Sequence, residues 1–264
     1  MKSVLNVLFG VFIFAQFSFT QFKPQNLSLS AEEFATAKKS FEQLNVNKPL
    51  VLHIPFDNQK DWDKELVKDQ SVITTVFAKD RYNNSDQCKA FNFGAEALQV
   101  KDGKYFNGNF TISVWVNVSN VSKWSRIIDF GLGQNNSNIV FSSSASLSGI
   151  PGLAIYKGEG TDLTQLRGKE SDRLKEGEWY HLCATLNGDT AKLFVNGNEI
   201  ASATGLYKPQ NINRTKCLVG KSNFYGYMDD LRIYSQALDL YAIKLLADYT
   251  LINKKNPSES ISLH

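Results

Sequence analysis

The fold class is decided by one stretch of sequence, Tyr180-His-Leu-Cys-Ala-Thr-Leu-Asn-Gly-Asp-Thr-Ala-Lys-Leu-Phe-Val-Asn-Gly197. Asn187-Gly188 and Asn196-Gly197 are typical turn signals, and each follows a run with the apolar character of a β-strand. In the run 179–186, apolar residues occupy every second position from Tyr180 onward, so one face of this strand belongs to a core. The stretch therefore predicts antiparallel strands joined by tight turns.

The same texture continues on both sides of this stretch, from residue 50 to residue 234. In the run 110–117, Phe110, Ile112 and Val114 share an apolar face, and Trp115 lies on the mixed face. Gly, Asn, Asp and Pro separate the strand-like runs, and no helix pattern intervenes, so we predict an all-β antiparallel domain. The expected strands are 50–56, 90–93, 110–118, 125–130, 138–143, 153–157, 179–186, 191–196, 217–220 and 227–234.

Helix patterns occur at the two ends of this β-region. Over residues 30–44, Ser30 and Glu33 have the spacing of a capping box, and one face carries Phe34, Ala37, Phe41 and Leu44. Apolar residues from 237 to 249 recur with helical spacing after the last strand. The predicted organisation is a signal peptide over 1–20, an N-terminal extension with an amphipathic helix over 21–48, a β-domain over 49–250 and a polar tail over 251–264.

Several features of the sequence agree with a secreted, extracellular glycoprotein. Residues 1–20 carry a positive charge at Lys2 and continue as an apolar stretch, with the small residues Ser18 and Thr20 at a plausible cleavage point, as in signal peptides. Sequons for N-glycosylation occur at Asn26, Asn83, Asn109, Asn117, Asn120, Asn135 and Asn213.

The chain has three cysteines, for which one disulfide and one free thiol is the simplest arrangement outside the cell. Loop-closure entropy does not choose the pair, because the alternatives differ by only about 1 kcal/mol. Cys183 lies in an apolar strand-like run, where a buried free thiol is common. We therefore favour Cys88–Cys217, with the other pairings left open.

Charge and hydropathy exclude two classes of partner. The 29 Lys+Arg and 26 Asp+Glu give a formal charge of +3, without a block of five like charges, so nucleic acid is not an expected partner. After residue 20, no apolar run approaches the roughly 20 residues that span a bilayer, so we expect no membrane span after signal cleavage. The sequence does not determine an oligomeric state.

Four segments in series resemble the LamG-like jelly-roll domain of the concanavalin A-like lectin/glucanase superfamily. They are Phe110-Thr-Ile-Ser-Val-Trp-Val116, Gly177-Glu-Trp-Tyr-His-Leu-Cys-Ala-Thr185, Lys192-Leu-Phe-Val-Asn-Gly-Asn198 and Val219-Gly-Lys-Ser-Asn-Phe-Tyr-Gly-Tyr-Met-Asp-Asp-Leu-Arg-Ile-Tyr234. The resemblance covers roughly residues 50–248 and implies a two-sheet antiparallel jelly-roll sandwich. It implies no single activity, because the fold includes lectins, adhesive modules, pentraxins and glycosidases.

Neither acidic cluster of the sequence matches a glycosidase site, which needs two carboxylates on a concave strand. Asp61, Asp63 and Glu65 have alternating spacing but follow the first strand in a polar stretch, and the acids between 170 and 176 lie in an expected loop. The three histidines accompany no nucleophile motif. We therefore expect no enzyme and no catalytic residue.

Calcium is the one cofactor that the resemblance suggests. In relatives of this fold, acids of the first and last strands meet around a structural ion, and here Asp57 with Asp229 or Asp230 is the corresponding set. Ordinary turn and surface aspartates are the alternative.

The sequence predicts a non-catalytic recognition module that binds a glycan or an extracellular protein. Sugar binding needs an exposed aromatic platform with amide and hydroxyl donors, and aromatic rings packed beneath loops are the alternative. A structural component of an extracellular assembly, with no small ligand, is the alternative function, and a glycosidase is the third. The candidate ligand-binding residues are Trp115, Asn117, Trp179, Tyr225 and Tyr227.

Overall fold

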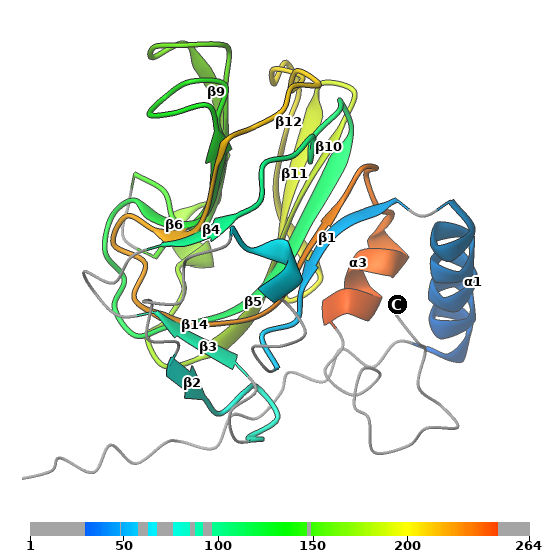
Figure 1. Cartoon of the computed structure of the whole chain (residues 1–264). Helices are drawn as coiled ribbons and strands as arrows, with labels where there is room; N and C mark the ends of the chain where they lie inside the picture. Colours follow the sequence, from blue (N-terminus) through cyan, green and yellow to red (C-terminus); the bar gives the residue numbers. More distant parts are fainter. Residues whose placement is uncertain are drawn as a thin grey trace, which may run out of the picture.

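The computed structural model describes residues 30–47, 49–57, 63–67, 76–84, 88–91, 97–146 and 149–247 (Figure 1). The expected signal peptide 1–20, the tail 251–264, Asn26 and Asp61 lie outside the described residues.

Two antiparallel sheets form a sandwich. Sheet A contains β1 (Leu50–Ile54), β2 (Val76–Ala78), β3 (Cys88–Phe91), β5 (Phe110–Val118), β10 (Trp179–Asn187), β11 (Thr190–Val195), β12 (Asn198–Ala203) and β14 (Gly226–Tyr234). Its order is β12-β11-β10-β5-β14-β3-β2, and β1 pairs with β14. Sheet B has the order β4-β13-β6-β7-β8-β9, from β4 (Leu98–Val100), β6 (Ser125–Gly131), β7 (Ile139–Ser144), β8 (Gly152–Tyr156), β9 (Leu163–Arg167) and β13 (Lys216–Lys221).

The strand register confirms the all-β prediction. β10 pairs with β11 through the predicted turn, with Leu186 opposite Ala191. Each of the ten predicted strands is present, and the structure adds the short strands β2, β4, β9 and β12. No position of β12 is buried, so its sequence lacks the apolar alternation by which a strand is predicted.

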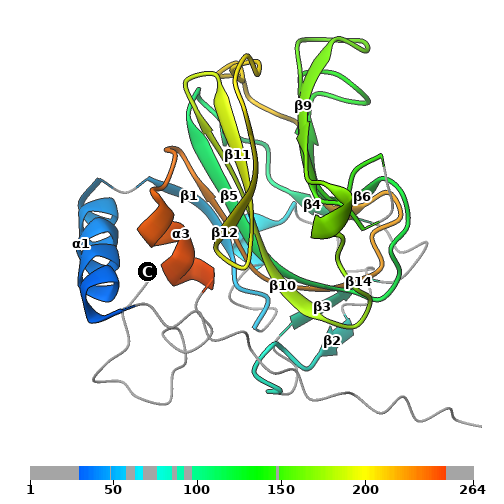
Figure 2. The same cartoon turned by 180° about the vertical axis from the view of Figure 1, so that it is seen from behind.

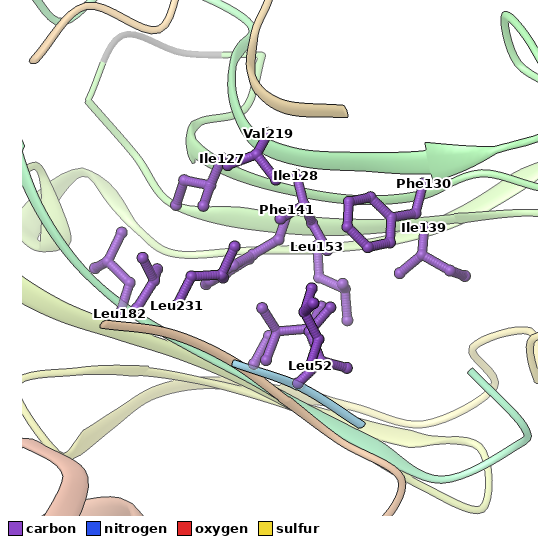
Figure 3. Packing of buried hydrophobic residues seen from close by; sticks show 14 of the residues in the cluster. Leu52, Ile127, Ile128, Phe130, Ile139, Phe141, Leu153, Leu182, Val219 and Leu231 are labelled. Carbon is purple, nitrogen blue, oxygen red and sulfur yellow. The ribbon is translucent and has the colours of Figure 1, made fainter. Parts of the chain in front are cut away.

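The core lies between the two sheets. Phe110, Ile112 and Val114 of β5 are fully buried there, as their alternation predicts. Sheet B contributes Phe130 and Phe141, and Figure 3 shows such side chains facing those of sheet A. Full burial of one large apolar side chain contributes about 1.5–3 kcal/mol, so this layer is the main source of stability.

Helix α1 (Ala31–Asn47) begins with the predicted capping box. The N–H of Glu33 donates to the Ser30 hydroxyl at 3.2 Å, and the N–H of Ser30 donates to the Glu33 carboxylate at 2.9 Å. The Glu33 side chain also accepts from Lys244 of α3 (Leu240–Ala247) at 3.1 Å. The capping box therefore both begins α1 and ties it to α3.

The two helices cover the outer face of sheet A. Ala37 and the partly buried Phe34 of α1 pack in one cluster with α3, Cys183 and Phe194. The side chains of Phe41 and Leu44 lie outside the description. Figures 1 and 2 show both helices on the side of β1 and β5, away from β6 and β9. Two 3-10 turns, Asp63–Glu65 and Glu170–Asp172, complete the regular structure. Within the described ranges, no helix is long and apolar enough to cross a membrane.

Candidate functional site

The two tryptophans predicted to bind a ligand are buried on the outer face of sheet A. Trp115 is 3% exposed, and its indole N–H donates to the carbonyl of Leu246 in α3 at 3.3 Å. Trp179 is 7% exposed and packs in one cluster with Trp115 and Cys88. The prediction of an exposed platform at these two residues is therefore wrong, because neighbouring side chains and α3 cover the face that carries them.

The other three predicted ligand residues have different environments. Asn117 is buried, and its amide donates to the carbonyl of Gly177 at 3.1 Å. The half-buried Tyr227 packs against Trp179 with ring centroids 6.4 Å apart, and burial raises its pKa. Tyr225 stays partly exposed in the loop before β14, where its carbonyl accepts from the N–H of Ser119 at 2.9 Å. Of the predicted set, Tyr225 alone lies in a loop.

The predicted glycosylation sites differ in their exposure to solvent. A glycan would attach to the buried amide nitrogen of Asn117, so a glycan at this sequon is incompatible with the described fold. Asn135 is half-buried. The exposed sequons of the described chain are Asn83, Asn109, Asn120 and Asn213.

The expected disulfide between Cys88 and Cys217 is not formed, and all three cysteines are buried free thiols. Cys88 packs with Trp115 on the outer face of sheet A, and its thiol donates to the Lys79 carbonyl at 3.1 Å. Cys217 lies in the core between the sheets. Sheet A therefore separates the two sulfur atoms, and burial raises the pKa of the Cys217 thiol to about 12.

The aspartates assigned to calcium do approach one another where the first and last strands pair. Asp57 is close enough to contribute to a raised pKa at Asp229, for which burial is the main cause and which Arg81 opposes. Arg81 contacts both Asp229 and Asp230, and Arg232 lies 2.9 Å from Asp230. The guanidinium groups of Arg81 and Arg232 therefore balance the negative charges of Asp229 and Asp230.

A calcium ion does not fit this set of donors. Burial alone would raise the pKa of Asp230, but Arg232, His53 and Arg81 hold it below its usual range. The part of the chain that the structure describes has no group of three His, Cys, Asp or Glu side chains that could hold a metal.

A serine–histidine pair is present in sheet A but has no access to solvent. The Ser113 hydroxyl lies 2.8 Å from Nε2 of His181, and His181 is fully buried. Burial, together with the charge of Arg81, lowers the pKa of His181 to about 3, so the imidazole is neutral at pH 7. We assign this pair a structural role.

The outer face of sheet B differs from that of sheet A because neither α1 nor α3 packs on it. Gln165 and Arg167 of β9 and Lys216 of β13 are exposed on it. Asp129 is the one acidic residue in the six strands, and Arg126 and Lys221 contact its buried carboxylate. Neither α1 nor α3 covers this face (Figure 2), although Val140 and Ser142 of β7 are buried on it.

An exposed tryptophan lies at one end of sheet B. Trp124 is 51% exposed, immediately precedes β6 and has φ of 64°, a strained backbone for a bulky residue. Its N–H donates to the Ala145 carbonyl at 2.9 Å. Strain of this kind persists only where surrounding contacts impose it, and it is frequent at functional sites.

Two loops build this end of the sandwich, which we name the Trp124 rim (residues 119–124 and 222–225). The Asn223 side chain donates to the Lys123 carbonyl at 3.2 Å, and the Ser125 hydroxyl donates to the Asn223 carbonyl at 2.8 Å. Tyr225 belongs to the same rim. The rim therefore combines an exposed indole, a tyrosine and amide and hydroxyl groups, which are the elements of a sugar-binding surface.

Trp124 is absent from the predicted set because the two tryptophans in that set, Trp115 and Trp179, are chosen for their places within strands. The available signal was composition: Trp124 ends the polar stretch Ser119-Asn-Val-Ser-Lys-Trp124 between two apolar strands. A tryptophan in such a loop has few neighbours that could bury it.

A comparison with known protein families agrees with the observed architecture. Residues 93–244, more than half of the chain, match the family described as the concanavalin A-like lectin/glucanases superfamily. The chain belongs to this superfamily. The family predicted from the sequence motifs is thereby confirmed, and the jelly-roll sandwich is its expected fold. A search of curated proteins gave no match to this superfamily member.

Solved structures agree with the superfamily fold. Domain 4 of AbnA, a GH43 extracellular arabinanase from Geobacillus stearothermophilus in complex with arabinotriose, is 18% identical, with a TM-score of 0.60 over 75% of this chain and 98% of that chain. The binding domain of Paraclostridial Mosquitocidal Protein 1 is 17% identical, with a TM-score of 0.50 over 76% of this chain and 52% of that chain. At sequence identities of 17% and 18%, this structural similarity establishes the fold alone.

Proposed function

We propose that this superfamily member is a secreted, non-catalytic recognition module that binds an extracellular glycan at the Trp124 rim. The observation that carries the proposal is the exposure of Trp124 beside a sheet face that neither α1 nor α3 covers, while the tryptophans of sheet A are buried. An exposed indole stacks on the apolar face of a sugar ring, and the neighbouring amide of Asn223 and hydroxyl of Ser122 supply hydrogen bonds.

The comparisons and the charges of sheet B support this proposal. The arabinanase domain of similar fold is described in complex with arabinotriose, a sugar oligomer. Glycosidic hydrolysis needs two carboxylates about 5–9.5 Å apart. The strands of sheet B contain only Asp129, and its Oδ2 lies 2.6 Å from Arg126. Binding without hydrolysis is therefore the activity that we assign to this face.

Secretion rests on the signal-peptide pattern of residues 1–20 and on the exposed sequons. The alternative role in an extracellular assembly requires a free apolar face on α1. Ala37 is fully buried against the α3 cluster, and Phe34 packs there too, so the described part of that face already has a partner within the chain. Glycan recognition is for this reason the function that we favour.

The test is a glycan array probed with protein secreted from a eukaryotic host, once with calcium and once with chelator. We expect selective binding in both conditions, loss of binding in Trp124→Ala and partial retention in Trp124→Phe, since a phenyl ring still stacks on sugar. Leu132→Ala is the matched control, because Leu132 is also an exposed apolar residue (40%) and follows the other end of β6. A blank array, or equal binding by Trp124→Ala, contradicts the proposal, and binding lost with chelator contradicts calcium independence.

A further inference from the structure

A row of positions with basic side chains at both ends crosses the outer face of sheet B. The strand register places Lys221 of β13 opposite Arg126 of β6, and Arg126 opposite Ser142 of β7. Ser142 is opposite Gly152 of β8, which is opposite Arg167 of β9. Directly opposed residues share a face of a sheet, so all five belong to one row across five strands. We name the three cations Lys221, Arg126 and Arg167 the basic row.

The basic row lies on the outer face. Phe141 and Leu166 point into the core, so their strand neighbours Ser142 and Arg167 point away from it. The two central positions carry small residues, Ser142 and Gly152, between the longer cationic side chains. With about 4.8 Å between strands, Arg126 and Arg167 are separated by roughly 14 Å. Ser142 is 4% exposed and Gly152 is buried beside Ala145, so the row presents cations on either side of a covered centre, two residues along β6 from Trp124.

A buried carboxylate fixes one half of the basic row. Oδ2 of Asp129 lies 2.6 Å from Arg126 and 3.1 Å from Lys221, and Oδ1 accepts from the amide of Asn138. Asp129 is 1% exposed, so both cations are held over a site that they shield from water. The Nε of Arg126 has no hydrogen-bond partner among the described residues.

Positive charge is in excess among the strand side chains of this face. Asp129 provides one negative charge against the three cations, and Arg167 makes no salt bridge within the described chain. Its guanidinium donates instead to the hydroxyl of Ser146. Arg126 has a side-chain exposure of 20% and Lys221 of 33%, so each retains a surface toward solvent. Guanidinium and ammonium groups with spare N–H donors select carboxylate or sulfate oxygens.

From this arrangement we infer that the basic row selects an anionic glycan, one that carries carboxylate or sulfate groups, for the ring-stacking site at Trp124. The inference rests on the proposed glycan-binding function and adds the charge class of the ligand to it. The stacked ring would lie at the Trp124 rim, and the acidic groups of the same chain would lie along Arg126 and Arg167. A neutral glycan would gain the stacking contact alone.

The experiment compares paired glycans that differ only in charge. Polygalacturonate and its fully methyl-esterified form test carboxylate recognition, and chondroitin sulfate and desulfated chondroitin test sulfate recognition. Titration calorimetry measures the affinity of the full chain, Trp124→Ala, the double variant Arg167→Gln/Lys221→Gln and the control Lys38→Gln/Lys39→Gln. The control removes the same charge from exposed positions of α1, and Arg126 remains in every variant to hold Asp129.

We expect one anionic member to bind roughly tenfold more tightly than its neutral partner, the scale of two screened ionic contacts. Arg167→Gln/Lys221→Gln removes this preference, whereas the α1 control keeps it, and added salt weakens only the anionic member. Equal binding of both members, lost in Trp124→Ala, overturns the charge selection and leaves the proposed function standing. An absence of binding to every glycan overturns both.

Discussion

Arg81 and Asp229 form an ion pair on the outer face of sheet A, and both side chains are almost completely buried, at 4% and 3% exposed. The guanidinium also lies 5.1 Å from the Trp115 ring and 3.8 Å from the Asp230 carboxylate. This side chain thus connects the turn at 81–82 to the last strand and to the buried tryptophan. A guanidinium occupies the place where the resemblance suggested a calcium ion.

The first prediction concerns this pair. Arg81→Met leaves the Asp229 carboxylate buried without its main cationic partner, so we expect a loss of about 3–5 kcal/mol in the free energy of unfolding. Asp229→Asn added to Arg81→Met removes the stranded charge and recovers part of that loss. Urea unfolding of both single variants and the double variant measures the coupling. Strictly additive losses would contradict a direct pair.

The second prediction concerns Gly220 of β13, which has φ of 73°. A Cβ atom there would lie 2.2 Å from the Phe91 ring, which is itself packed edge-on against Phe224. Gly220→Ala should therefore destabilise the fold by several kcal/mol, through backbone strain and collision together. Gly205→Ala is the control, because Gly205 has φ of 81° but no atom within 4 Å of its added Cβ.

Strain alone costs about 1 kcal/mol, so Gly205→Ala should shift the urea midpoint much less than Gly220→Ala. Equal shifts in the two variants would show that Phe91 moves aside without cost.

Sequence reasoning succeeded where local periodicity determines the structure. Alternation in 110–117 is enough to place Phe110 in the core, and the spacing of Ser30 and Glu33 is enough to begin a helix. Periodicity does not say what covers the other face of a strand. Trp115 was predicted to be exposed, and it is buried because α3, more than a hundred residues later, packs over it.

The candidate site on sheet B was beyond sequence reasoning for a related reason. Lys221, Arg126 and Arg167 are unremarkable in sequence, and only the pairing of five strands aligns them. Overall charge is small and evenly spread, so composition gave no sign of a local excess. The disulfide prediction was wrong because spacing along the chain does not reveal that Cys88 and Cys217 face opposite sides of sheet A.

The third prediction tests the cysteines directly. Protein unfolded in urea with iodoacetamide and without reductant should take up three alkyl groups, because all three thiols are free in the fold. Reductant should leave the midpoint of thermal unfolding unchanged, since no covalent loop is opened. Uptake of a single group, with two more after reduction, would mean that a disulfide forms.

The fourth prediction follows from the buried imidazole of His181. Burial lowers its pKa to about 3 in the folded chain, against about 6.5 when unfolded. Between these values the unfolded chain binds a proton that the folded chain does not, so acidification favours unfolding. The contribution of the neutral His181 to the free energy of unfolding is fully present above pH 6.5. It is lost as the pH falls toward 3, by up to about 1.4 kcal/mol per pH unit.

His181→Gln isolates this contribution, because Gln does not titrate and can still hydrogen-bond to Ser113. At pH 7.5 the variant should be less stable than the natural chain through imperfect packing. At pH 4.5 the gap should narrow by about 2–3 kcal/mol, since only the natural chain bears the cost of keeping this imidazole neutral. Other groups, including Asp229, titrate in both proteins and cancel in the difference. Urea unfolding at the two pH values measures the gap, and a gap that stays constant would mean that His181 is accessible to protons in the folded chain.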